Sequence, residues 1–544
     1  MSTTQTWRWA CVAAVEVPIV VAVIVALRTD WTPVADWALI DVEVRGVGTA
    51  ATPLIGAYSR FGWNHPGPGM WYLLAVPTRL LGGSPSALLA AAAVAHGIAA
   101  AGAVLTAWRR GGALLGGLTT LVVAALLRSL GTGFLVDPWN PFVPIVALLW
   151  FLLAVWDGAL GSPRGTVAAV VVGSLAVQSH VAFAPVVLAT GAVAGVVAVW
   201  RGRRDSAELR RRWHPGWLIG LWCAVVVLWL PPVLQQVTGE RGNLGEVVAF
   251  AVGGAGDDTA DAAAGLDTTV GVEAAARLVV RDVVVGPRWL VGPVEAWRVA
   301  VATEPWWLLA VPLAALAVVG WLGRRRIDVL AAQLLAATAL VAVTVGTAAI
   351  RGFAFDWLTR ATWPVGAFVA LMVGWGAASV VLDRVAWRPA PTTWRVLGAG
   401  TLAVAVALAL PAIGSGGTAT PPQWAFSAPT GAVVDQTAAW LADHPAASVR
   451  VVDLGAGVVA TGLLAGLDRA GVPIVVSDDQ ADVLLPGRAT AGADGAARDL
   501  LVVAGGDAIA AMAARPGMVQ VAAMTPSDVE ADAGVPSIGV FTAG

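Results

Sequence analysis

The sequence predicts an α-helical, polytopic membrane protein with about eleven transmembrane helices and a small C-terminal α/β domain. Three observations predict this fold class. Of the 544 residues, 58% are hydrophobic and only 12% are charged, whereas soluble domains carry about 25% charged residues. Eleven segments approach the ~20 apolar residues that a helix needs to cross a bilayer. Arginines cluster between these segments in an alternating pattern.

The predicted transmembrane segments are 9–27, 86–107, 112–130, 141–158, 165–180, 181–200, 216–236, 305–323, 328–349, 362–382 and 396–413. The first is expected to be retained, because no A-x-A-like cleavage site precedes the polar loop. Gln178, Ser179 and His180 divide one long apolar run into two helices. Residues 69–83 are too short to span comfortably, and they are predicted to lie along the interface with Trp71 and Tyr72 at headgroup level.

Arginine placement predicts the orientation of these segments. With eleven spans and the N-terminus inside, the positive-inside rule places every basic cluster in the cytoplasm. These clusters are Arg8, Arg109 with Arg110, 201–212, 324–326, and Arg384 with Arg388 and Arg395. The polar segments 28–85, 131–140, 237–304 and all residues after about 414 would then lie outside. All 33 basic residues are arginine, a usage typical of a high-GC, actinobacterial genome. The predicted location is therefore the inner (plasma) membrane.

Two parts are expected: a transmembrane domain over 1–413 and, after a linker over 414–429, an extracytoplasmic α/β domain over 430–544. Strands are predicted near 448–452, 473–476 and 500–503, and helices near 457–470 and 507–514. Gly455 and Gly457, with Asp478 further on, match a dinucleotide-binding pattern. Because the domain is expected outside the cell, these glycines are interpreted as allowing tight strand–helix packing.

The first outer loop concentrates polar residues over 36–45 and 58–68. A helix starting at Asp36 would gather Ala38, Leu39, Val42 and Val47 on one face, with Asp41 and Arg45 four residues apart on another. This pattern predicts an amphipathic surface helix. A solvated helix capped by Asp36 is the simpler explanation, but the residues that follow favour a functional one.

An aspartate at the start of an amphipathic helix, an arginine nine residues later, His65 followed by Pro66, and a helix bearing Trp71 and Tyr72 form one pattern. This pattern resembles the first outer loop of GT-C glycosyltransferases, the membrane enzymes related to protein mannosyltransferases and lipid A aminoarabinose transferases. The resemblance covers roughly the first 200 residues by motif and the remainder by topology.

The resemblance implies that Asp36 is the catalytic base, that Arg45 supports the helix and that His65 is the basic residue of the loop. Trp37 stands where many relatives have a second acidic residue, so the base remains open between Asp36 and Asp41. The implied activity is inverting transfer of a sugar from a polyprenyl-phosphate donor to a cell-envelope glycan, lipid or protein, without nucleic acid. No cofactor is assigned, and a divalent metal is left open.

Sugar transfer from a lipid phosphate requires a carboxylate to accept the acceptor's proton and cations to stabilise the departing phosphate. His65, Arg60 and Arg360 are the candidate cations. Three other outer segments, 137–141, 178–180 and 356–360, would face the same cavity. Each also has a simpler explanation: prolines that start a helix, a histidine hydrogen-bonded between helices, and a buried Asp356–Arg360 ion pair. The predicted substrate-binding residues are Glu43, Arg45, Tyr58, Arg60, Asn64, His65, Trp139, Asn140, Gln178, His180 and Arg360.

Two other functional classes fit a polytopic chain. A transporter or lipid flippase would show internal repeats and polar groups at mid-membrane; no clear repeat is seen, and Glu16 is the one carboxylate singled out within a span. An inactive scaffold would use the outer α/β domain to bind partners or glycan.

Overall fold

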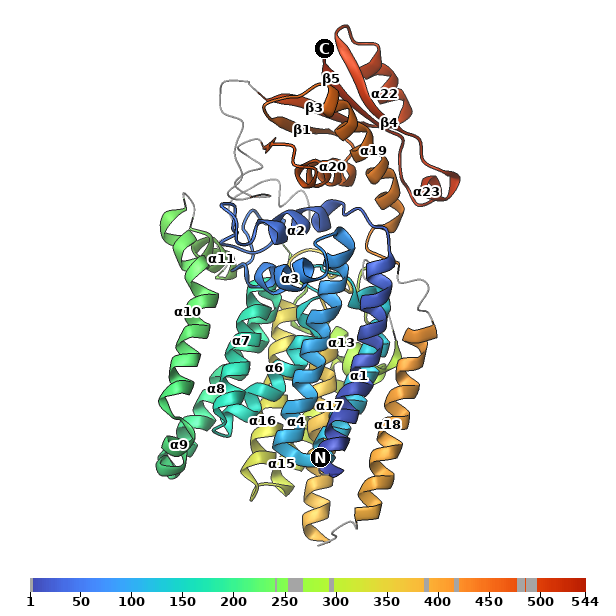
Figure 1. The fold of residues 1–544 in the computed structure, drawn as a ribbon. Helices are drawn as coiled ribbons and strands as arrows, with labels where there is room; N and C mark the ends of the chain where they lie inside the picture. Colours follow the sequence, from blue (N-terminus) through green and yellow to red (C-terminus); the bar gives the residue numbers. More distant parts are fainter. Residues whose placement is uncertain are drawn as a thin grey trace.

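The computed structural model describes residues 3–239, 242–252, 268–292, 298–385, 391–414, 420–476, 485 and 497–544. A bundle of long helices lies beneath a small C-terminal α/β domain, and helices α2 and α3 lie between the two (Figure 1). This arrangement confirms the predicted fold class of a helical membrane domain with a small α/β domain.

Each of the eleven predicted apolar segments is helical. The long helices are α1 (Thr3–Arg28), α4 (Pro85–Leu130), α6 (Pro144–Ala159), α7 (Pro163–Ser179), α8 (Ala184–Arg204), α10 (Pro215–Thr238), α15 (Ala310–Leu322), α16 (Ile327–Ala348), α17 (Thr362–Arg384) and α18 (Pro391–Gly414). Short helices η1 (Val181–Phe183), α9 (Ser206–Arg212) and η3 (Trp306–Leu309) adjoin them. Among the described residues, six helices are long and apolar enough to cross a bilayer by length and composition. The chain is thus a multi-pass membrane protein.

Local sequence explains where several of these helices begin and bend. Pro85, Pro144, Pro163 and Pro215 occupy the first turn of their helices, where the missing N–H of proline costs nothing. Helix α4 contains a sharp break at Gly112, whose φ of 60° and ψ of −150° are non-helical. A glycine adopts this conformation without steric cost. The break separates the two spans that were predicted on either side of Arg109 and Arg110.

Shorter helices lie between the long ones along the chain. They are α2 (Ala35–Gly46), α3 (Gly69–Leu80), α5 (Thr132–Leu135), α11 (Asn243–Ala251), α13 (Val272–Val280), the π-helical η2 (Arg281–Val285) and α14 (Arg288–Val291). Helix α3 is the short helix predicted over 69–83.

The C-terminal domain is built on a five-stranded sheet in the order β2-β1-β3-β5-β4. Strands β1, β2 and β3 are parallel, whereas β5 is antiparallel to both β3 and β4. Its elements are α19 (Trp424–Asp443), β1 (Val449–Leu454), α20 (Val458–Arg469), β2 (Ile474–Val475), β3 (Arg498–Ala504), α22 (Gly506–Ala513), β4 (Met518–Met524), α23 (Asp528–Asp532) and β5 (Ile538–Ala543). Because α19 begins at Trp424, the end of the predicted linker is helical.

Helix α2 is not the surface helix that the sequence predicted. Trp37, Ile40 and Val44 belong to the core of the helical bundle, whereas Ala38 and Val42 belong to the core of the C-terminal domain. Its apolar residues therefore serve two cores rather than one, and the helix is enclosed between them. Asp36 does not cap it: the cap residue is Val34, without a side-chain hydrogen bond.

Candidate active site

A cavity lies against α2 at the upper end of the bundle. Its open space, counted together with the solvent at its mouth, is about 410 Å³. It is lined by Asp36, Leu39, Ile40, Glu43, Gly56, Ala57, Tyr58, Asn64, Trp71 and Asn140. Four of these residues come from α2 at spacings of three, four and seven, which places them on one helix face. Five of the predicted site residues, namely Asp36, Glu43, Tyr58, Asn64 and Asn140, thus meet at one cavity.

Asp36 is an exposed residue whose carboxylate borders this cavity. Its Oδ2 accepts a hydrogen bond of 2.9 Å from Nε1 of Trp139. The surrounding protein removes part of the water from the Asp36 carboxyl and so raises its pKa above the ordinary value, and the bond from Trp139 partly opposes that shift. A carboxylate whose proton affinity is raised is a better general base near neutral pH.

Asp137 provides a second carboxylate beside Asp36. Its Oδ1 accepts bonds from Nε1 of Trp37 at 2.7 Å and from the backbone N–H of Trp139 at 2.9 Å. Burial raises the pKa of Asp137 to about 7, the charge of Asp36 adds to the rise, and Arg360 opposes it. No role was predicted for Asp137 from the sequence. Its position two residues before Trp139, a predicted substrate-binding residue, could have indicated it.

Arg360 is buried among aromatic rings close to Asp137. Its guanidinium carbon lies 5.2 Å from the ring centroid of Phe134, 5.4 Å from that of Phe142 and 4.9 Å from that of Trp363. Burial lowers the pKa of Arg360 to about 10, although nearby carboxylates oppose the shift. Arg360 therefore keeps its positive charge at neutral pH.

A buried ion-pair network holds the segment that carries Arg360. Arg281 bonds Asp356 and Asp282, each at 2.7 Å. The Thr362 hydroxyl donates to Asp282 at 2.8 Å. Asp356 therefore forms a buried ion pair with Arg281, whereas the pair expected from the sequence was with Arg360. In the sequence, Arg281 and Asp282 are adjacent charged residues within an apolar stretch, and this pattern could have indicated the buried ion pairs.

His65 and His180 lie side by side, with their ring centroids 4.2 Å apart. Nδ1 of His65 accepts a hydrogen bond from the backbone N–H of Val181 at 3.3 Å. Burial, with a smaller contribution from His180, lowers the pKa of His65 well below its ordinary value. Burial beside a second imidazole therefore disfavours the charged form of His65. The role of His65 as a cation in the loop stays a prediction.

Three other predicted residues have structural partners. Gln178 is fully buried and accepts from the backbone N–H of Gly69 at 3.0 Å while donating to the carbonyl of Leu228 at 2.8 Å. Asn140 donates to the carbonyl of Ser179 at 3.1 Å and still lines the cavity. Arg60 is exposed and donates to the carbonyl of Arg351 at 2.9 Å. Gln178 and Arg60 are not among the cavity-lining residues.

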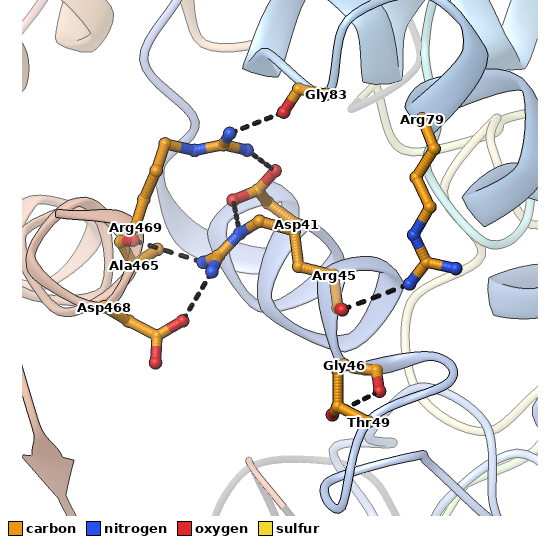
Figure 2. Close-up of polar contacts among 9 residues, drawn as sticks. All are labelled: Asp41, Arg45, Gly46, Thr49, Arg79, Gly83, Ala465, Asp468 and Arg469. Carbon is orange, nitrogen blue, oxygen red and sulfur yellow. Dashed lines mark hydrogen bonds and ion pairs between the residues drawn. The ribbon is translucent and has the colours of Figure 1, made fainter. Parts of the chain in front are cut away.

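Asp41 and Arg45 face the C-terminal domain rather than the cavity (Figure 2). Asp41 Oδ2 pairs with Nε of Arg45 at 3.0 Å, and Asp41 Oδ1 pairs with Nη2 of Arg469 at 2.5 Å. The predicted spacing of Asp41 and Arg45 is confirmed. Since both oxygens of Asp41 are bound by arginines, the structure favours Asp36 over Asp41 as the base.

The glycine pattern of the C-terminal domain does not form a free phosphate cradle. The Asp453 carboxylate accepts from the backbone N–H groups of Ala456 and Gly457, at 2.7 and 3.0 Å. These are the amides that a phosphate would need, and Asp478 lies outside the described residues. Within the described part of the chain, no group of three or more His, Cys, Asp or Glu side chains could hold a metal ion.

No family model matches the chain, and no curated protein sequence matches it. Two solved structures match nearly its whole length. ArnT from Cupriavidus metallidurans bound to undecaprenyl phosphate has a TM-score of 0.56 and 15% sequence identity. The apo state of ArnT has a TM-score of 0.54 and the same identity, and each comparison covers 99% of this chain and 98% of ArnT. The chain therefore shares the fold of ArnT, and the fold implied by the resemblance in its first interhelical loop is confirmed.

Proposed function

We propose that this protein is a membrane glycosyltransferase that moves a sugar from a polyprenyl-phosphate donor to a cell-envelope acceptor on the outer face of the inner membrane. One observation carries the proposal: the Asp36 carboxylate borders a cavity at one end of a membrane bundle with the ArnT fold. A general base in a cavity of this kind suits transfer to a hydroxyl group.

The proposed chemistry begins with Asp36. Its carboxylate accepts the proton of the acceptor hydroxyl as that oxygen attacks the anomeric carbon of the donor sugar. The bond between the anomeric carbon and the phosphate oxygen breaks, its electron pair stays on the phosphate, and the configuration inverts. Tyr58, Asn64 and Asn140 border the same cavity and offer hydrogen-bonding groups to the sugars.

Stabilising the departing phosphate requires a cation, and Arg360 is a buried arginine close to Asp137. Asp137 accepts a backbone hydrogen bond from Trp139, whose indole donates to Asp36. Burial disfavours the charged form of His65, and Arg60 is exposed, whereas Arg360 is buried close to Asp137. We therefore assign the phosphate to Arg360 first. A charge-assisted hydrogen bond contributes roughly 1.5–3 kcal/mol.

The lipid character of the donor has two supports. ArnT, whose fold this chain shares, was solved with undecaprenyl phosphate. In addition, an apolar groove with about 980 Å³ of empty volume runs between α8 and α16, from Pro185 and Leu188 to Val341 and Val345. Its α8 end lies a few residues beyond His180, so a polyprenyl tail in this groove would leave its phosphate near the outer end of the bundle.

The proposal is tested with purified full-length protein in lipid vesicles, a crude cell-envelope acceptor fraction and two donor classes. Labelled sugar should pass to the acceptor from a polyprenyl-phosphate sugar, and the Asp36→Asn variant should not support this transfer. Transfer from a nucleotide sugar without added lipid phosphate would refute the donor assignment. Movement of the lipid across the bilayer without transfer would favour a flippase instead.

A further inference from the structure

Helix α20 of the C-terminal domain lies along α2, the helix that carries Asp36 (Figure 1). The contact is polar on one side. Nη1 of Arg45 pairs with Asp468 at 2.6 Å, and its Nη2 donates to the carbonyl of Ala465 at 3.3 Å. Asp41 pairs with Arg469. Two residues of α2 are thus bound to three residues of α20.

Arg469 connects α2 to the membrane domain as well. Its Nη1 donates to the carbonyl of Gly83 at 2.6 Å, in the loop between α3 and α4 (Figure 2). Its Nη2 meets Asp41, whose side chain is only 2% exposed. The guanidinium group of Arg469 therefore links α2 to the loop that precedes helix α4.

The same face of α20 packs closely against the residues that precede Asp36. A β-carbon on Gly462 would lie 3.0 Å from Cγ1 of Val34 and 3.1 Å from the carbonyl oxygen of Pro33. Ala35, which follows, has a φ of +48°. This left-handed conformation is uncommon for a residue with a β-carbon, and it persists only where the surroundings enforce it. Gly462 and Arg469 are seven residues apart, so they lie on one face of α20.

We propose that Arg469 is a positioning residue for Asp36: through Asp41 and Gly83 it fixes α2, with the aid of the close packing at Gly462, so that the Asp36 carboxylate stays at the cavity. The C-terminal domain is then a structural part of the active site rather than an independent module. This inference rests on the proposed role of Asp36.

The test compares Arg469→Gln with Arg469→Lys and with Arg450→Gln in full-length protein. Arg450 is a matched control, because it also pairs with an aspartate of the C-terminal domain, Asp499 at 2.8 Å, and its side chain is 35% exposed against 27% for Arg469. Small displacements of a catalytic group cost up to roughly 100-fold in rate. We expect Arg469→Gln to lower kcat about 10- to 100-fold with little change in the KM for donor.

Lysine keeps the charge but lacks the planar fork of arginine, so Arg469→Lys should recover part of the lost kcat. Hydrogen exchange supplies a readout that needs no turnover. The amides of 36–46 should exchange faster in Arg469→Gln than in the wild type or in Arg450→Gln. If Arg469→Gln does not fold, Asp468→Asn weakens the same contact from α20 and should show the same two effects.

Unchanged exchange over 36–46 would overturn the proposal, as would faster exchange with an unchanged kcat. A fall in kcat of the same size in Arg450→Gln would also overturn it, because the effect would then be general to the domain. Failure of the proposed function is distinguishable from these results: the wild-type protein would show no sugar transfer at all, while the exchange measurement would still report whether Arg469 holds α2.

Discussion

The carboxylate of Asp36 and the indole of Trp139 are joined by a hydrogen bond of 2.9 Å, although 103 positions separate the two residues. A second hydrogen bond joins the same two segments in the opposite direction: the indole of Trp37, next to Asp36, donates to Asp137 at 2.7 Å. The two indole rings lie 5.6 Å apart. Two aspartates and two tryptophans thus exchange partners between α2 and the loop before α6, and neither bond can break without disturbing the other.

Asp36→Asn should lower the rate of sugar transfer by ~10²–10⁴-fold, the typical cost of losing a general base. The amide oxygen can still accept the bond from Trp139, so the fold should persist. The measurement is kcat at saturating donor and acceptor. Asp41→Asn is the comparison and should cost less, because Asp41 acts on position alone. Normal transfer by Asp36→Asn with a large loss in Asp41→Asn would assign the base to Asp41.

Trp139→Phe should shift the acidic limb of the pH–rate profile to higher pH. The indole N–H stabilises the charged form of Asp36, so its removal should raise the pKa of that carboxyl further. A base must be deprotonated to act, and the rate would therefore fall off at a higher pH than in the wild type. Trp156→Phe is the control, since Trp156 donates to the carbonyl of Asp328 instead. Equal shifts in both variants would contradict the assignment.

Asp137→Asn should change how stability depends on pH. Burial raises the pKa of Asp137 to about 7, whereas an aspartate in an unfolded chain titrates near ~3.9. Between these two values the folded state holds a proton on Asp137 that the unfolded chain has lost. The contribution of this proton to the free energy of unfolding is therefore complete below about pH 4 and is lost as the pH rises through about 7.

Asparagine at this position is neutral at every pH. The hydrogen bonds from Trp37 and Trp139 both go to one oxygen, which the amide oxygen of asparagine can replace. Thermal unfolding in detergent should therefore show Asp137→Asn more stable than the wild type at pH 8, with the difference shrinking towards pH 5. Parallel stability curves for the two proteins would show that Asp137 does not titrate in this range.

The helical bundle could be predicted from sequence because its signal is local. A run of apolar residues long enough to cross a bilayer can be recognised without information from the rest of the chain, and every predicted segment is helical. Strands β4 and β5 and helix α19 were not predicted. Met518–Met524 is largely exposed and was not separable by pattern from a loop, and α19 contains Pro429, which reads as a helix breaker.

The candidate site could be predicted only in part, because its assembly depends on contacts between distant segments. Asp36 was identified by its place in a motif. Asp41 lies only five residues later, yet it faces Arg469 instead of the cavity. This orientation depends on the C-terminal domain, because 428 positions separate Asp41 from Arg469. The lowered pKa of His65 follows from its burial and from the neighbouring His180, and no local sequence pattern contains either.

Reporter fusions test the predicted orientation of the chain. Fusions after residues 60, 270 and 430 should report an outside location, and fusions after 110, 205 and 325 an inside one, because arginine-rich segments stay in the cytoplasm. The site lies at the same end of the bundle as the C-terminal domain (Figure 1). An inside result at 430 would therefore move the site itself to the cytoplasm and make a nucleotide sugar the expected donor.

Arg360→Gln should impair use of the donor more than use of the acceptor. If Arg360 binds the phosphate, its loss removes a charge-assisted hydrogen bond of roughly 1.5–3 kcal/mol, which corresponds to a fall of about 10- to 150-fold in kcat/KM for the polyprenyl-phosphate sugar. The KM for acceptor should stay within about two-fold, since the acceptor's hydroxyl is activated by Asp36.

Arg60→Gln separates this assignment from its rival. Arg60 is exposed and donates to the backbone carbonyl of Arg351, so its replacement should leave donor use nearly unchanged. Equal losses in the two variants would mean that both arginines meet the phosphate. A loss confined to Arg60→Gln would move the phosphate to the exposed rim, where screening by salt should weaken donor binding as ionic strength rises. A donor bound at the buried Arg360 should show a much smaller salt dependence, because buried charges are screened less.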